Sequence, residues 1–434
     1  MRGAAHTPAH PAGMVVADSG APALGAPGAH VYKGAMCPPS PRLRARRAPL
    51  RARVMSAATL AALVPVIPAH AQDPASGAPV VSEIATGLEV PWDLAFLPDG
   101  RALVTERPGR IRIVDAARRL REAPAAWVTV STRGDGGLLG IAADPAFGPA
   151  APFVYISHTV GDELRVSRYR VAGDALTLDA VVLGGVVAGP VHASARVRFG
   201  PDGAMYVATG DGGSASRSQR ATSLNGKLLR VGPGAFRAGR VTPEVLASGL
   251  RHPQGLAWQP GTGRLFITDH GPSDFDGPSG DDELNVFVPG GNYGWPARRG
   301  ADQSPYISPV HLWAETIAPA SIAFVARPGS AWTGDALVTG LRGQVLRRLT
   351  VAGGRVTGDT PLLQGVHGRL RAVAEAPDGS IWVTTSNRDG WRDPFPGDDR
   401  ILRIVPPPAP ATPHQDRSPQ VPSRPPGFAG TARG

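Results

Sequence analysis

The chain of 434 residues contains a single cysteine, Cys37. One cysteine excludes a disulfide within the chain, and it excludes a zinc site built on several thiolates. No segment keeps the 3.6-residue apolar period of an amphipathic helix. The apolar run 54–68 is too short for a membrane-spanning helix, which needs about 20 residues. We therefore expect neither a helical bundle nor a disulfide scaffold, and no membrane span.

Excess charge of one sign is also lacking, except at the two ends of the chain. The formal net charge is +10, from 45 basic and 35 acidic residues. Eight of the basic and one of the acidic residues lie within 1–71, and three basic and one acidic lie within 406–434, which leaves 34 and 33 in 72–405. A nucleic-acid-binding domain would carry the positive charge itself, so nucleic acid is not expected as a partner.

The two ends of the chain differ in composition from the middle. A basic run (42–53), the apolar run 54–68 and the small residues around Ala71 form the three-part layout of a secretory signal peptide. This layout predicts cleavage after Ala71 and a periplasmic or secreted chain. A disordered low-complexity leader is the alternative for 1–71. Residues 1–41 are Pro/Gly/Ala-rich, unlike the start of a signal peptide, and a start codon assigned too far upstream would explain them. The Pro-rich tail 406–434 is expected to be disordered, because it has few large apolar residues to bury.

The middle segment, 72–405, is rich in short apolar runs that repeat. An apolar run ends in a Pro-Asp-Gly-like turn, a second run follows, and in most copies a glycine loop leads to a third. Such runs predict hairpin strands. Strands alone at a spacing of about 50 to 70 residues predict an all-β, six-bladed β-propeller, with two stacked β-sandwiches as the alternative. The copies begin near Trp92, Leu139, Val197, Gly255, Ile322 and Val373.

Two loops that precede repeats carry side chains suited to catalysis. His192 lies just before the third repeat, and histidine is the side chain best suited to accept a proton near neutral pH. Arg251 lies beside a proline-stiffened turn before the fourth repeat, and its guanidinium forks onto carboxylates. A lone histidine or arginine in a loop is also common on a solvated surface, so each residue alone leaves both interpretations open.

The longest loop follows the second strand of the fourth repeat. It contains Asp269–Pro272, an insertion, Asp281–Asn285 and Gly290–Pro296. Carboxylates and backbone carbonyls around glycine and proline suit calcium, which takes six to eight oxygen ligands. The spacing does not fit a calcium-binding helix-loop-helix motif, and a solvated acidic loop is the alternative.

Further arginines precede the later repeats. Arg342 lies in the fifth, and Arg369 and Arg371 open the sixth, where strand alternation puts both side chains on one face. The loops at one end of a propeller channel converge. These arginines and Arg251 are thus expected to converge at one end of a domain whose net charge is close to zero. Such a cluster of cations predicts a polyanionic ligand.

Together these segments resemble the soluble glucose/sorbosone dehydrogenase family, which depends on pyrroloquinoline quinone (PQQ), and especially its bacterial aldose sugar dehydrogenases. The resemblance spans roughly 82–405, and the family is a six-bladed propeller. The ordered set of motifs is specific, although no single piece is. The motifs are Val90–Trp92, Gly137–Gly140, the His192 segment with Arg198–Gly203, Arg251–Gly255, His270–Pro272 with Asp282–Asn285, and Asn292–Pro296.

The resemblance implies oxidation of an aldose sugar or related alcohol, with hydride passing to PQQ and His192 acting as general base. It implies that Arg251 pairs with a quinone oxygen and stabilises its developing charge. The cofactor's three carboxylates need cations, and calcium makes the quinone more electrophilic. The implied cofactor-binding residues are Asp135, Arg251, His252, His270, Arg342, Arg369 and Arg371.

Two calcium ions are implied as well. The backbone carbonyls of Gly271 and Pro272 match the ligands of the calcium on the cofactor, and Glu283 and Tyr293 match ligands of a second, structural calcium. The implied partners are the sugar and an external electron acceptor, for a monomer or dimer.

The chain departs from the family's glucose dehydrogenases at three positions and in one loop. It has Asp135 where they have Gln, His252 where they have Asn and Val191 where they have Asp, and the insertion Ser273–Gly280 lengthens the calcium loop. These departures bear on cofactor affinity and substrate more than on the fold.

Two other functions fit a six-bladed propeller. A non-catalytic sugar- or protein-binding propeller would be expected to lack His192, Arg251 or the pair Arg369 and Arg371, and all four are present. A metal-dependent sugar lactonase needs Glu, Asn and Asp side chains on one central metal, and it would leave the arginines unexplained.

Overall fold

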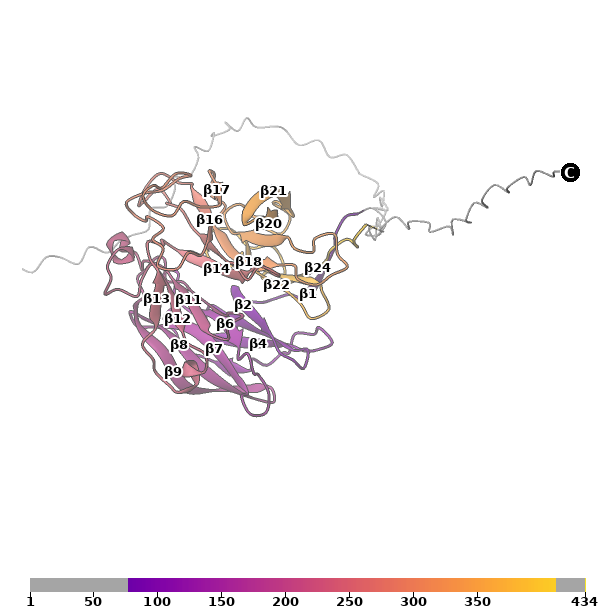
Figure 1. Cartoon of the computed structure of the whole chain (residues 1–434). Helices are drawn as coiled ribbons and strands as arrows, with labels where there is room; N and C mark the ends of the chain where they lie inside the picture. The colour runs from indigo at the N-terminus through magenta and orange to yellow at the C-terminus, as the bar shows by residue number, and fades with distance from the viewer. Residues whose placement is uncertain (1–76, 411–433) are drawn as a thin grey trace, which may run out of the picture. The chain divides into compact units, whose positions relative to one another are not determined.

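In the computed structural model, which describes residues 77–410 and Gly434, 24 strands form six four-stranded antiparallel sheets. The innermost strands contact each other in sequence order, and the last contacts the first, so the sheets close into a ring. Figure 1 shows the six blades following one another in colour around a common centre. The predicted six-bladed β-propeller is confirmed, and the two-sandwich alternative is wrong for this part of the chain.

Each blade runs from an inner strand at the centre to an outer strand at the rim. From inner to outer, blades 1 to 3 are β2 (Pro91–Phe96), β3 (Ala102–Glu106), β4 (Arg110–Val114), β5 (Ala126–Trp127); β6 (Leu138–Ala143), β7 (Phe153–Val160), β8 (Glu163–Ala172), β9 (Ala175–Val187); and β10 (Ala195–Phe199), β11 (Met205–Thr209), β12 (Lys227–Val231), β13 (Glu244–Ala247). Blades 4 to 6 are β14 (Pro253–Trp258), β15 (Leu265–Asp269), β16 (Asp282–Val286), β17 (His311–Trp313); β18 (Pro319–Phe324), β19 (Ala336–Gly340), β20 (Val345–Ala352), β21 (Arg355–Leu362); and β22 (Leu370–Glu375), β23 (Ile381–Thr385), β24 (Ile401–Val405), β1 (Val80–Ala85). Two short 3-10 helices, Ala215–Ser218 and Ala235–Arg237, lie in the loops of blade 3.

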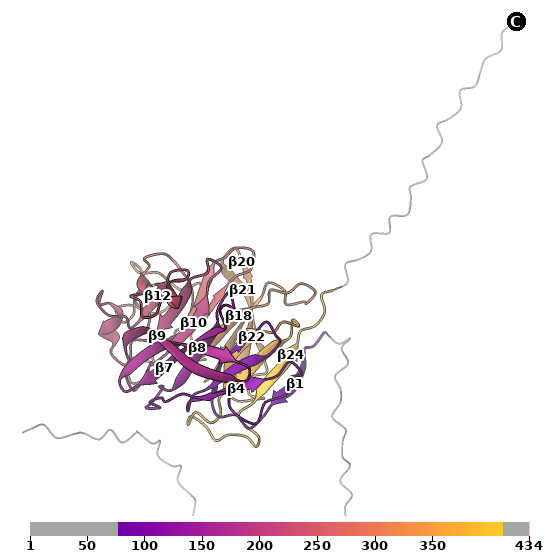
Figure 2. The ribbon, with the colours of Figure 1, turned by 90° about the horizontal axis from the view of Figure 1, so that it is seen from below.

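The ring is closed by strands from the two ends of the fold. β1 pairs antiparallel with β24, with Val80 opposite Val405 and Glu83 opposite Leu402. Figures 1 and 2 both show the indigo β1 beside the yellow β24. The closed ring leaves no unpaired blade interface, which is how a propeller limits its exposed sheet edges.

The repeat seen in the sequence lacks the outer strand of each blade and, in blade 4, also the third strand, β16 (Asp282–Val286). The outer strands were not recognised, because their faces are largely solvated and carry no regular apolar alternation; β21, for example, contains no buried residue. The expectation that Asp282–Asn285 belongs to a loop is also wrong. These residues form β16, which pairs with β15 through Asp269 and Glu283.

The apolar core lies between blades rather than within them. Five of the six clusters of buried side chains combine residues of two adjacent blades, and the sixth joins blades 2 and 3 and also includes Trp92 of blade 1. Phe266 and Leu284 of blade 4, for example, pack against Ile322 and Val338 of blade 5. A four-stranded sheet cannot bury its faces alone, so each blade depends on both neighbours.

A hydroxyl group on the second strand of most blades links that blade to the next. It donates a hydrogen bond to a backbone carbonyl of the next inner strand, in a fully buried position. The pairs are Thr105 with Leu139, Ser157 with Ala195, Thr268 with Pro319, Thr339 with Arg371 and Thr384 with Pro91. In blade 3 the linking hydroxyl is that of Ser194, which donates to Pro253.

Only one prediction about the chain ends concerns residues that the structure describes. The sequence predicts a disordered tail from residue 406, but the amide of Ala331 donates to the carbonyl of Pro407, and that of Ala409 donates to the carbonyl of Gly329. The first residues of that segment are therefore part of the ordered structure. The signal peptide, the cleavage after Ala71 and residues 411–433 of the tail lie outside the described residues. Within those residues, no helix is long and apolar enough to cross a bilayer.

Candidate active site

A cavity of about 370 Å³ lies where loops from all six blades meet. Eight of the residues predicted for the site line it: Asp135, His192, Arg251, His252, His270, Arg342, Arg369 and Arg371. The predicted metal-ligating residues Gly271, Pro272, Glu283 and Tyr293 do not line it. The fold thus brings together side chains that span 236 positions of sequence, Asp135 to Arg371.

His192 is held in an unusual backbone conformation at the cavity wall. Its φ is 58°, in the left-handed region that costs a non-glycine residue of order 1 kcal/mol or more. Its amide donates to Oδ2 of Asp135 at 2.7 Å. Gly210 packs against its carbonyl so closely that a Cβ there would lie 2.1 Å from the oxygen. These two contacts fix the direction of the imidazole.

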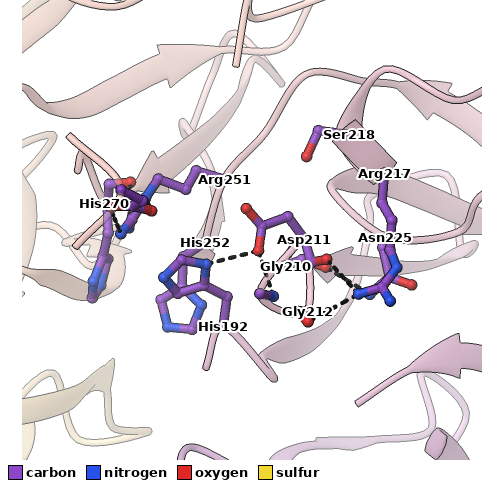
Figure 3. A network of polar contacts seen from close by, with 12 residues as sticks. His192, Gly210, Asp211, Gly212, Arg217, Ser218, Asn225, Arg251, His252 and His270 are labelled. Carbon is purple, nitrogen blue, oxygen red and sulfur yellow. Dashed lines mark hydrogen bonds and ion pairs between the residues drawn. The ribbon is translucent and has the colours of Figure 1, made fainter. Parts of the chain in front are cut away.

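The imidazole of His192 is paired with Asp211, which the sequence analysis did not identify. Nδ1 of His192 lies 2.7 Å from Oδ1 of Asp211 (Figure 3). A carboxylate accepts hydrogen bonds, so this contact favours the tautomer with the proton on Nδ1, in which Nε2 is the nitrogen that can accept a proton. Nε2 has no hydrogen-bond partner among the described residues.

Asp211 is itself positioned by two further donors. The amide of Gly213 donates to Oδ1 at 2.8 Å, and the indole Nε1 of Trp295 donates to Oδ2 at 2.9 Å. The predicted hairpin of the third repeat contained the information needed to find Asp211. Because Ala195 lies opposite Thr209, residues shortly before β10 lie near residues shortly after β11. A carboxylate two residues past β11 could have been assigned to His192 on that basis.

Arg251 is buried at the cavity wall, with 3% of its side chain exposed. Its backbone amide and that of His252 donate to the two oxygens of Asp269, at 2.9 and 2.6 Å. Burial raises the pKa of Asp269 to about 6, although these hydrogen bonds act in the opposite direction. The guanidinium of Arg251 donates two hydrogen bonds to the carboxylate of Asp276, which lies in the loop between β15 and β16.

A group of three imidazoles lines the cavity. The ring of His252 lies 5.0 Å from that of His192 and 4.8 Å from that of His270, centroid to centroid. Burial, together with nearby positive charge, holds the pKa values of His252 and His270 well below the usual range, so both rings are neutral. His252 Nδ1, His270 Nε2 and the hydroxyl of Thr316 are buried and have no partner within the described region.

Arg369 and Arg371 meet on one carboxylate. Nε of Arg369 donates to Oδ2 of Asp389 at 2.8 Å, and Nη2 of Arg371 lies 3.5 Å from the same oxygen. Burial lowers the pKa of Arg371 to about 10, which leaves it charged at neutral pH. Two guanidinium groups share one carboxylate, so the pair retains positive charge for an anion in the cavity.

Arg342 approaches the cavity from blade 5 and is the most exposed of the predicted arginines. Its Nη1 lies 3.5 Å from the hydroxyl of Ser279, at the limit of a hydrogen bond. It has no carboxylate partner among the described residues, so its charge is available to a ligand.

Gly271 and Pro272 follow β15 at the rim of the cavity. The amide of Gly271 donates to Oδ1 of Asp282 at 2.8 Å, and Oδ2 of Asp282 accepts from the amides of Ile317 and Ala318. One buried carboxylate therefore fixes two loops. A Cβ on Gly271 would lie 2.0 Å from the carbonyl oxygen of Gly280, so only glycine fits this crowded group of carbonyls.

Glu283 lies in a separate polar group behind the cavity. Its carboxylate accepts from the side-chain amides of Asn285 and Gln303. Burial, and then the charge of Asp269, raise the pKa of Glu283 to about 8. The amide oxygens of Asn285 and Gln303 are buried and unpartnered in the described structure.

Tyr293, the other residue predicted for the structural calcium, uses its side chain elsewhere. The hydroxyl donates to the carbonyl of Val286 at 2.8 Å and accepts from the amide of Val288 at 3.1 Å. A metal ligand at this position would have to be its backbone carbonyl. Across residues 77–410, no three His, Cys, Asp or Glu side chains are grouped to hold a metal ion, so a cation here would depend on carbonyl oxygens.

Comparisons with known proteins agree on one family. The family model for glucose/sorbosone dehydrogenases matches residues 88–392. The chain is 28% identical to the aldose sugar dehydrogenase of Escherichia coli, over 70% of this chain and 89% of that protein. It is similar to a Thermus thermophilus structure described as a glucose dehydrogenase (45% identity, 76% and 100% coverage, TM-score 0.69). It is also similar to the PQQ-bound aldose sugar dehydrogenase of Streptomyces coelicolor (36% identity, 76% and 98% coverage, TM-score 0.67).

Proposed function

Since the chain belongs to the glucose/sorbosone dehydrogenase family, we propose that it oxidises an aldose sugar or related alcohol with bound PQQ and calcium. The observation that carries the proposal is the cavity in which the His192–Asp211 pair faces a group of arginines. A base and a cluster of cations in one cavity suit a reaction that takes a proton from a substrate beside a polyanionic cofactor.

The residues of the cavity fit PQQ. The cofactor carries three carboxylates, and Arg342, Arg369 and Arg371 supply positive charge at the cavity wall. The buried, unpartnered atoms of His252, His270 and Thr316 are polar groups that a ligand could satisfy, and buried polar atoms without a partner are uncommon in native proteins. Asp135 also lines the cavity, with one oxygen already committed to the amide of His192.

The residues proposed for calcium fit a hard cation. The crowded carbonyls near Gly271 offer oxygen ligands beside the cavity, and Pro272 would contribute its carbonyl. For the second ion, Glu283 is a buried carboxylate flanked by the free amide oxygens of Asn285 and Gln303. A cation at Glu283 would favour the ionised carboxylate, against the burial that raises its pKa.

In the proposed reaction, His192 takes the proton of the substrate hydroxyl on Nε2. Asp211 keeps the Nδ1 proton in place and stabilises the imidazolium that forms. Arg251 would donate hydrogen bonds to a quinone oxygen, where negative charge develops. When bound, PQQ would supply the acceptor for the hydride that leaves the carbon bearing the hydroxyl, and calcium would make the quinone more electrophilic. The C–OH group thus becomes C=O, and the two electrons pass on to an external acceptor.

The proposal extends to partners and location. The substrate is a small sugar or alcohol, and the electron acceptor is a separate molecule. The family resemblance and the predicted signal peptide support a location in the periplasm or outside the cell. A monomer or dimer is what the family resemblance implies.

The test is a titration of the purified, cofactor-free protein with PQQ at saturating calcium, followed by dye reduction with a panel of aldoses and simple alcohols. We expect saturable, calcium-dependent activity, and His192→Ala should remove it while PQQ still binds. Failure of the protein to bind PQQ would overturn the proposal in favour of a binding propeller. Full activity of His192→Ala would overturn the assigned base.

A further inference from the structure

The loop Ser273–Gly280 places two adjacent side chains on the two groups that the reaction needs. Oδ2 of Asp276 accepts from Nε of Arg251 at 2.8 Å, and Oδ1 accepts from Nη2 at 3.0 Å. The ring of Phe275 lies 5.7 Å from that of His192, at a tilt of 33°. One short segment therefore contacts both Arg251 and His192.

The carboxylate of Asp276 occupies the position on Arg251 that an anionic ligand would take. Asp276 forks across the Nε–Nη2 edge of the guanidinium, the arrangement by which arginine recognises planar groups with two oxygens. Oδ1 also accepts from the amide of Ser273 at 3.0 Å, so the carboxylate is fixed within its own loop. Burial alone would raise the pKa of Asp276, but these hydrogen bonds and the charge of Arg251 lower it, so it is ionised at neutral pH.

Phe275 lines the cavity beside His192. Its side chain is a large apolar group left 64% exposed, yet it lies against His192 and within 5.7 Å of the Arg251 guanidinium. Apolar side chains of this size are usually buried, so the position is held by the loop and not by a core. A substrate hydroxyl that reaches Nε2 of His192 has to share this side of the cavity with the ring.

The loop is suited to move as one piece. Gly277 and Gly280, at its centre and end, both have positive φ (155° and 125°). Apart from Phe275 and Asp276, the hydrogen bonds of 274–279 with side chains outside the loop are few: Arg299 donates to the carbonyl of Pro278, and Arg342 approaches Ser279 at 3.5 Å. Gly280 is the fixed end of the segment, because it packs closely against Gly271 and Ala314. Loss of the Asp276–Arg251 pair would therefore free most of the segment.

We propose that Asp276 is an internal competitor for the anion site of Arg251, and that cofactor loading displaces it together with Phe275. The inference rests on the proposed function, because the displacing anion is PQQ. Asp276 then sets how tightly the cofactor binds, and the loop covers the catalytic groups until the cofactor is present. The cofactor has to exchange one set of charge-assisted hydrogen bonds for another, which weakens its apparent affinity.

The test compares PQQ binding by the cofactor-free protein and three variants at saturating calcium, measured by quenching of tryptophan fluorescence. Asp276→Asn keeps the shape and removes the charge, so we expect PQQ to bind roughly tenfold more tightly and to associate faster. Asp276→Glu keeps the charge and should bind within a few-fold of the wild type. Asp274→Asn is the matched control, because it removes one charge from the same loop without touching Arg251.

A second measurement does not depend on turnover or on the variants. Hydrogen exchange of backbone amides in 273–280 should become faster when PQQ binds to the wild-type protein, since the segment loses its anchor. Equal or weaker PQQ binding by Asp276→Asn, or slower exchange of the loop on loading, would overturn the proposed competition. If all four proteins bind PQQ equally, only this inference fails. If none binds it, the proposed function fails as well.

Discussion

The imidazole of His192 and the carboxylate of Asp211 form a buried pair, with Nδ1 2.7 Å from Oδ1. Nineteen residues separate them in sequence, and the β10–β11 hairpin closes that distance. The pair is held from both sides: Asp135 binds the amide of His192, and Trp295 binds the second oxygen of Asp211. A neutral imidazole with a fixed tautomer is the form required of a general base.

Replacing Asp211 should separate catalysis from cofactor binding. In Asp211→Asn, the side-chain amide can donate a hydrogen bond to Nδ1, which favours the wrong tautomer of His192, so we expect kcat to fall roughly 10²- to 10⁴-fold. The affinity for PQQ should change by less than a few-fold, because Asp211 does not line the cavity. Steady-state dye reduction gives kcat, and fluorescence titration gives the affinity.

Trp295→Phe is the graded control for that experiment. It removes one hydrogen bond to Asp211 and leaves the carboxylate, so its loss of kcat should be smaller than that of Asp211→Asn. A pH profile of kcat unchanged in Asp211→Asn would contradict a role for Asp211 in setting the base.

Arg369 should act on affinity and not on the chemical step. In Arg369→Ala, we expect the dissociation constant of PQQ to rise by roughly 10- to 100-fold, the effect of one charge-assisted pair, with kcat preserved at saturating PQQ. Arg388→Ala is the matched control, because Arg388 lies in the same region, donates to the carbonyl of Asp398 and does not line the cavity. An equal loss of PQQ affinity in both variants would mean that Arg369 acts only through the overall positive charge of this region.

The hydroxyl links between blades should contribute to stability. Thr105 donates to the carbonyl of Leu139 at 2.5 Å, and both residues are fully buried. Thr105→Val leaves that carbonyl unpaired, which should lower the free energy of unfolding by about 1–3 kcal/mol. Urea unfolding measures the change, and Thr177→Val, at an exposed position of β9, should alter it little. Equal stability of the Thr105 variant and the wild type would mean that the carbonyl finds another partner.

A carboxylate between blades 4 and 5 should make stability depend on acid pH. Burial alone would raise the pKa of Asp359, but hydrogen bonds from His311, Arg347 and Trp313 lower it to about 2. Because the pKa is lower in the folded state than in the unfolded chain, the stabilisation is complete above about pH 4 and is lost as the pH falls through 2.

Asp359→Asn should therefore destabilise the protein at pH 7 by about 2 kcal/mol, and the difference from the wild type should shrink toward pH 2. Urea unfolding at a series of pH values measures this dependence. Asp302→Asn, at an exposed position, should show no such trend. A difference that stays constant with pH would rule out the ion pair as its source.

The number of blades and most inner strands could be read from the sequence. Inner strands are buried on both faces, so they appear as apolar runs that end in marked turns, as in Leu139–Pro145. Outer strands such as β21 and β1 could not be predicted from the sequence pattern, because a solvated strand at the rim needs no apolar alternation. β1 was also hidden by its position, since it completes the last blade from the beginning of the fold.

The sequence by itself determined the chemistry that this protein carries: a histidine, an excess of arginine in blade-entry loops, and oxygen-rich turns. These follow from residue type and from order along the chain, which local sequence contains. Only the tertiary structure decided the partners of those groups. Asp211 on His192, Asp389 under Arg369 and Asp276 on Arg251 are set by hairpin register and by where the ring of blades brings loops together. Such distances depend on closure of the whole ring, so no local pattern encodes them.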